Sequence, residues 1–213
     1  MTTAGIILIR THLNGTGALF WLGNALTASG LWLLAAAFGN YKGATAQEIE
    51  RVTGLQFRKS HFMVTLGYLE MEGERDGNKV ILRKTDGASK SAYTSELIFM
   101  ITGQAEAGFS LAIYPEGFTR RPFGFFPPAL SDRPGWAKQH GLVVRGKPGG
   151  EAGAGAERIW RTASATLPVK ELRLLKISGR EMRAEFVKME EPYEPEEVKR
   201  LLDLCLRIYQ SST

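Results

Sequence analysis

Hydrophobic and polar positions follow a helical period in the first part of the chain. Residues 17–38 are almost wholly apolar, and residues 11–41 contain no Asp, Glu, Lys or Arg. Residues 45–53 and about 57–71 carry apolar side chains at the three- and four-residue spacing of an amphipathic helix. Gly54 separates these two segments and suits a helix end. The pattern therefore predicts an apolar helix over 26–38, a turn at 39–43, a short helix over 45–53 and a further helix over 57–71.

A hairpin is expected directly after these helices. Asp76 and Gly77 form a dipeptide that favours tight two-residue turns. Short segments flank it at 73–75 and 79–84, and apolar residues alternate in the second of them.

The second half of the chain is richer in strand patterns. We expect strands at 97–101, 109–114, 142–145 and 158–165, and an antiparallel hairpin of 172–177 with 181–189 about Ser178-Gly179. Residues 146–156 are rich in glycine and predict a flexible loop. Pro195, followed by Glu196 and Glu197, begins a helix with a broad apolar stripe. The fold class expected for the whole chain is α+β, and the mainly antiparallel sheet and the terminal helix are expected in the second half.

The expected domain boundary lies in a small, polar stretch. Residues 85–92, TDGASKSA, are typical of a linker. The prediction is a domain over 1–86, a linker over 87–92 and an α+β domain over 93–213 that serves dimerisation, sensing or partner docking. The apolar run at 17–38 is long enough to cross a bilayer. However, Asn24, Thr27 and Ser29 interrupt it, so we expect buried helices and no membrane contact.

Composition narrows the partners and the compartment. The net charge is +5 and the pI about 9.4, which favours an anionic partner such as nucleic acid. The basic excess lies between Glu116 and Arg183. Cys205 is the single cysteine, so no internal disulfide can form, and a reducing cytoplasm is the expected location.

The order helix, helix, turn, helix and hairpin resembles the winged helix-turn-helix family of DNA-binding domains. The resemblance covers about residues 25–85 and is carried by TAQEIERVTGL and by YLEMEGERDGNKVILRKT. It implies that the helix over 57–71 enters the major groove of duplex DNA and that the hairpin touches the neighbouring backbone. The residues implied as DNA contacts are Thr45, Gln47, Arg58, Lys59, Ser60, His61, Arg75, Asn78 and Lys79.

Two functions follow as alternatives. The first is a transcriptional regulator that binds duplex DNA as a homodimer. The second is a non-catalytic subunit of a nucleic-acid-processing assembly, in which the winged domain contacts a protein and the second half contacts single strands or RNA. Arginines interleaved with aromatic rings suit stacking on unpaired bases; the candidates are Arg120, Arg121, Phe123, Phe125, Phe126, Arg133 and Trp136. Rings that cover a hydrophobic core beneath a long loop are the simpler explanation of this stretch.

Catalytic and metal-binding motifs are not recognisable. The three histidines, His12, His61 and His140, lack a second ligand at metal spacing. The glycines of 146–156 match neither a P-loop nor a dinucleotide-binding loop. We expect no metal, no cofactor and no enzymatic activity.

Overall fold

The computed structural model describes residues 18–63, 66–88, 93–117, 133–146 and 150–212. The chain divides into two units, Met1–Ala46 and Gln47–Thr213. Helices and strands contribute 38% and 40% of the structure, which confirms the α+β class. In the described part of the chain, no helix is long and apolar enough to cross a membrane. Residues 5–9, GIILI, form a short apolar run that suits a strand, and they lie outside the described residues.

A single long helix replaces the first two expected helices. Helix α2 runs from Ala18 to Thr53, so the turn expected at 39–43 is wrong. Gly54 ends the helix as expected, with a positive φ of 70° and its N–H donated to the Glu50 carbonyl at 2.8 Å. The Thr53 hydroxyl donates to the Ile49 carbonyl at 2.6 Å and supports the last turn.

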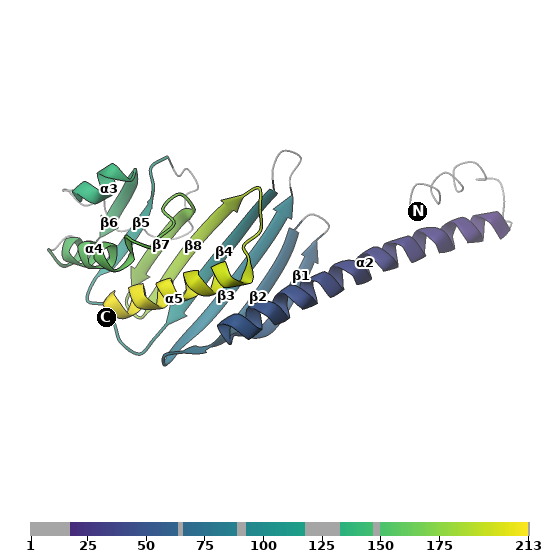
Figure 1. Cartoon of the computed structure of the whole chain (residues 1–213), viewed down its shortest axis with the longest axis horizontal. Coiled ribbons are helices and arrows are strands. Elements are labelled where there is room, and N and C mark those ends of the chain that lie inside the picture. The colour runs from purple at the N-terminus through teal and green to yellow at the C-terminus, as the bar shows by residue number, and fades with distance from the viewer. Residues whose placement is uncertain (1–17, 64–65, 89–92, 118–132, 147–149, 213) are drawn as a thin grey trace. The chain divides into compact units, whose positions relative to one another are not determined.

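One antiparallel sheet of eight strands forms the second unit, in the order β1-β2-β3-β4-β8-β7-β5-β6 (Figure 1). Its strands are β1 (Gln56–Met63), β2 (Leu66–Arg75), β3 (Asn78–Ala88), β4 (Tyr93–Thr102), β5 (Ser110–Pro115), β6 (Leu142–Gly146), β7 (Leu172–Ser178) and β8 (Glu181–Met189). The helices that follow Gly54 are α3 (Gly135–Gln139), α4 (Gly150–Ala163) and α5 (Pro195–Ser212).

The helix expected over 57–71 is wrong, because this segment forms β1 and most of β2. Apolar residues there also suit a strand: Leu69 and Met71 alternate with Glu70 and face the core. Strand β2 pairs with β3 along its whole length, which satisfies backbone groups on both strands. The winged helix-turn-helix layout is therefore not confirmed. The expected hairpin is present, with Asp76 and Gly77 both at positive φ as a tight turn requires.

The expected linker at 87–92 does not separate two domains. Strands β3 and β4 lie on either side of residues 89–92 and pair antiparallel from Lys79↔Thr102 to Ala88↔Tyr93. The division of the chain lies instead between Ala46 and Gln47.

The second half follows the sequence predictions except around residues 146–165, where two predictions fail. Strands β4, β5 and β6, the β7–β8 hairpin and the helix beginning at Pro195 are confirmed. The strand expected at 158–165 and most of the loop expected at 146–156 are wrong, because α4 occupies 150–163. Gly155 in this helix packs against Phe109, which directly precedes β5: a Cβ at Gly155 would lie 2.7 Å from the Phe109 ring, so glycine permits this close approach.

The core lies on the face of the sheet against which α4 and α5 pack (Figure 1). Directly paired residues on this face form a continuous apolar row across all eight strands, and all but the first are buried: Phe57, Met71, Leu82, Phe99, Ala184, Leu175, Ile113 and Val144. Because side chains alternate along each strand, the neighbouring row points to the opposite face. We call that opposite face the outer face.

Candidate nucleic-acid interface

The outer face carries a second row of directly paired residues, and its chemistry differs from that of the core. From β1 to β6 the row reads Gln56, Glu72, Ile81, Met100, Arg183, Lys176, Ala112 and Arg145. We call it the outer row. Its middle is apolar and half-buried, and a basic end follows on β8, β7 and β6.

Two cations face each other at the basic end of the outer row. Lys176 and Arg183 are a direct cross-strand pair, and Arg145 follows two strands further on. Like charges directly opposite each other destabilise a sheet. Arg183 forms an ion pair with Glu185 on its own strand, at 2.6 Å, and Glu181 lies two residues before it on the same face. Neither Lys176 nor Arg145 forms an ion pair with any residue that the structure describes. This arrangement leaves an excess of positive charge that an anion can neutralise.

An aromatic ring accompanies the basic end. The Arg145 guanidinium lies over the Tyr114 ring, 5.9 Å from its centroid, and its Nε donates to the Tyr114 hydroxyl at 2.6 Å. This cation–π contact and hydrogen bond fix the guanidinium in place without neutralising it. Ala112 lies between Lys176 and Arg145 in the row and adds no bulk there.

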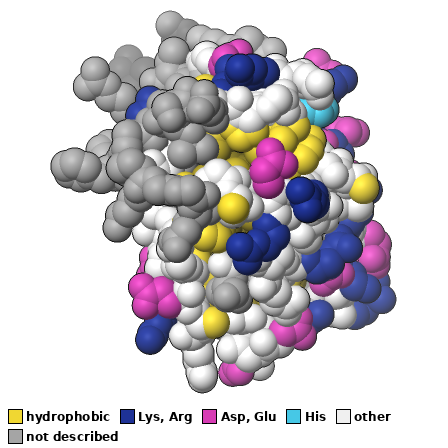
Figure 2. Space-filling view, turned by 90° about the vertical axis from the view of Figure 1, so that its left-hand side faces the viewer, with side chains coloured by type: hydrophobic (Ala, Val, Ile, Leu, Met, Phe, Trp, Pro, Cys, Tyr) yellow, Lys and Arg dark blue, Asp and Glu magenta, His cyan; other side chains and the backbone are white. Residues whose placement is uncertain are grey.

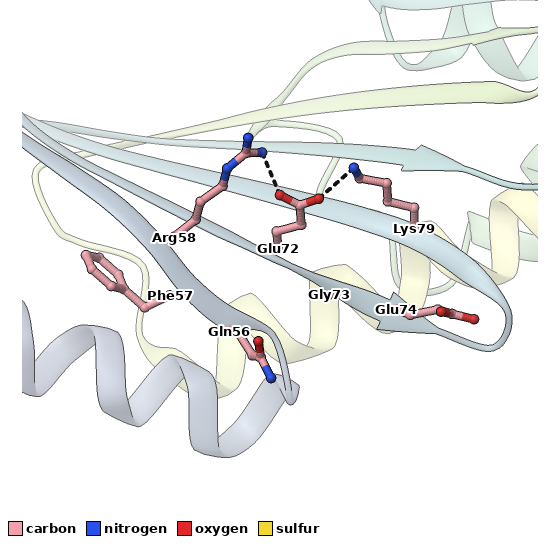
Figure 3. A pocket seen from close by; sticks show the side chains of 7 residues that line it. All are labelled: Gln56, Phe57, Arg58, Glu72, Gly73, Glu74 and Lys79. Carbon is pink, nitrogen blue, oxygen red and sulfur yellow. Dashed lines mark hydrogen bonds and ion pairs between the residues drawn. The ribbon is translucent and has the colours of Figure 1, made fainter.

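The other end of the outer row is a charge-balanced groove with a volume of about 560 Å³. Figure 3 shows Arg58 and Lys79 reaching toward Glu72 from either side. The Arg58 guanidinium lies 2.5 Å from one carboxylate oxygen and the Lys79 ammonium 2.6 Å from the other. The hydrogen bond from Lys79 and the nearby Arg58 charge outweigh partial desolvation and lower the pKa of Glu72. Glu72 is therefore ionised at neutral pH.

A buried carboxylate extends this network onto β3. Glu70 is 1% exposed, and its two oxygens face Arg83 at 2.8 Å and Arg58 at 3.8 Å. A buried carboxylate is tolerated when cations and hydrogen bonds surround it. The charges of β1, β2 and β3 thus largely neutralise one another, in contrast to the basic end.

The residues implied as DNA contacts do not form one surface. Arg58 and Lys79 are brought together, but through Glu72. Arg75 donates to the Thr53 carbonyl, and Asn78 donates to the Asp76 carbonyl at 3.1 Å. Thr45 and Gln47 lie in α2, on opposite sides of the division between the two units. Lys59, Ser60 and His61 are in β1, and their side chains are outside the described residues.

The candidates for contact with single strands do not form one surface either. Arg120, Arg121, Phe123, Phe125 and Phe126 lie outside the described residues. Arg133 and Trp136 instead make internal contacts: Arg133 pairs with Glu116, and Trp136 stacks on Trp160 with ring centroids 4.5 Å apart. Figure 2 shows hydrophobic side chains gathered among charged ones at this end of the molecule.

Sequence reasoning missed Arg145, Lys176 and Arg183. The opposition of Lys176 and Arg183 could have been found, because the β7–β8 hairpin and its turn were both predicted and fix this register. The place of Arg145 depends on β5 lying between β7 and β6, which no local pattern indicates. Within the described ranges, no group of three or more His, Cys, Asp or Glu could hold a metal ion.

No family model, curated protein or solved structure matches this chain.

Proposed function

We propose that this chain is a non-catalytic nucleic-acid-binding protein that holds single strands of DNA or RNA on the outer face of its sheet. The observation that carries the proposal is the direct opposition of Lys176 and Arg183, with Arg145 in the same row. Phosphate groups would relieve the repulsion between these side chains, and basic grooves that follow a sugar–phosphate backbone are the common basis of such binding.

Three features favour single strands over duplex DNA. The segment expected to form a helix in the major groove forms two strands, β1 and β2, instead. The basic residues lie on a broad sheet rather than on a projecting helix or ribbon. Half-buried apolar side chains, Ile81 and Met100, continue the row beyond Arg183 and offer a surface for unpaired bases. One chain supplies every residue of this row, so binding does not require the expected homodimer.

The experiment compares labelled single-stranded DNA, RNA and duplex of mixed sequence by fluorescence anisotropy. The tested variant is Lys176→Met with Arg183→Met, which removes the facing cations and keeps apolar bulk. The control is Lys199→Met with Arg200→Met on α5, which removes the same charge from two exposed positions. We expect the tested variant to lose about tenfold or more in single-strand affinity and the control to lose little.

Other results would contradict the proposal. Equal losses in both variants would mean that only net charge matters. Preference for duplex, unchanged in the tested variant, would favour a DNA-binding surface elsewhere. Absence of binding to every probe would remove nucleic acid as the ligand of this face.

A further inference from the structure

The groove at the other end of the outer row holds a carboxylate where a phosphate would fit. We propose that Arg58 and Lys79 form a second phosphate subsite, and that Glu72 occupies this subsite while no strand is bound. This inference rests on the proposed single-strand binding, because it places both subsites on one path across the outer face.

The geometry of the three side chains supports such a subsite. Arg58 and Lys79 each bind a different oxygen of Glu72, as two cations would share two oxygens of one phosphate (Figure 3). Their side chains are 52% and 57% exposed, so a ligand in the groove can reach both. Phe57, on the neighbouring core row, also borders the groove and is 46% exposed.

The two subsites are far enough apart to need a long ligand. Glu72 and Arg145 are six strand-to-strand steps apart in the sheet order, and neighbouring strands are about 4.8 Å apart, so the path is about 29 Å long. A stacked strand rises about 3.4 Å per nucleotide, so about eight or nine nucleotides would cover it. About four nucleotides would reach from Arg145 to Arg183 and no further.

Glu72 competes with the phosphate in this arrangement. Exposed ion pairs are weak, so an entering phosphate can displace the carboxylate. Removing the charge of Glu72 should therefore strengthen binding only for strands that reach the groove. In water, two unit charges about 4 Å apart interact by about 1 kcal/mol, which corresponds to about fivefold in affinity.

The test uses the full chain with Glu72→Gln, which keeps the size of the side chain and removes its charge. Binding is measured with single strands of about 12 and about 4 nucleotides. We expect about fivefold tighter binding of the long strand and no change for the short one. Glu48→Gln on α2 is the charge-matched control, because Glu48 is exposed and forms no ion pair with a described residue. Adding Lys79→Met to Glu72→Gln should cancel the gain.

The outcomes separate this inference from the function on which it rests. If the paired Lys176 and Arg183 changes weaken binding while Glu72→Gln leaves the long strand unaffected, the second subsite is wrong and single-strand binding stands. An equal gain for both strand lengths, or an equal gain from Glu48→Gln, would reduce the effect to net charge and also contradict the subsite. If the wild-type protein binds neither strand and Glu72→Gln restores nothing, both proposals fail.

Discussion

Replacing Lys176 by Met should stabilise the protein while it weakens ligand binding. Lys176 faces Arg183 directly across β7 and β8. Directly opposed side chains have Cβ atoms about 5 Å apart, and two like charges at that distance repel by about 0.8 kcal/mol in water. Methionine keeps the apolar stem of the lysine and removes the charge. We therefore expect the free energy of unfolding to rise by about 0.5–1 kcal/mol at low salt.

Urea unfolding at two salt concentrations checks this prediction. The gain should be largest at about 0.01 M salt and nearly vanish at about 1 M, where the screening length falls to about 3 Å. Lys79→Met is the matched control, because Lys79 pairs with Glu72 across the sheet and its loss should lower stability instead. A Lys176→Met protein that is no more stable at low salt, or whose gain persists at high salt, would refute the repulsion on which the candidate interface rests.

Three further predictions concern groups whose burial or contacts the structure fixes. Arg83→Met should lower the free energy of unfolding in urea by about 1–2 kcal/mol, because Glu70 is 1% exposed and loses one of its cations; an unchanged midpoint would contradict this. Tyr209→Phe should lower the free energy of unfolding by about 1–2 kcal/mol, because the Tyr209 hydroxyl lies 3.1 Å and 3.0 Å from the Ala105 and Arg180 carbonyls. The same change should speed amide exchange at the nearby Ala107, and unaltered exchange would argue against this role of the hydroxyl. Burial raises the pKa of the Cys205 thiol, so iodoacetamide at about pH 8 should label the protein in urea and spare the native state; rapid native labelling would show that the α5 core is open.

The sequence predicted those elements whose partners are close in the chain. The β7–β8 hairpin was predicted because Met182, Ala184 and Phe186 alternate with polar residues and Ser178-Gly179 supplies the turn. The terminal helix was predicted from its apolar stripe, all of which is buried in α5. In both cases the local pattern and the tertiary packing agree.

The errors arose where distant contacts decide the structure. In α4, Ala152, Ala156, Ile159 and Ala163 form a buried helical stripe, yet the surrounding glycines resembled a flexible loop. Gly155 is favourable there only because the Phe109 ring lies against it. In the same way, the helical spacing of the apolar residues in 57–71 was overridden by pairing with β3, which no local pattern shows.

Only part of the candidate interface could be predicted from the sequence, because the rest depends on contacts between distant parts of the chain. Lys176 and Arg183 are neighbours through a hairpin, whereas Glu72 and Arg145 join their row through the order of eight strands. The net charge of +5 favours an anionic partner, but it does not indicate which face of the sheet carries the cations.

The most direct test of the central proposal is the salt dependence of single-strand binding by the wild-type chain. Lys176, Arg183 and Arg145 would each neutralise one phosphate, and each contact adds about 0.7 to the slope of log affinity against log salt. We predict a slope of magnitude about 2, falling by about 1.4 when Lys176 and Arg183 become Met. A slope near zero, or a steep slope that these two substitutions leave unchanged, would contradict binding through the outer face.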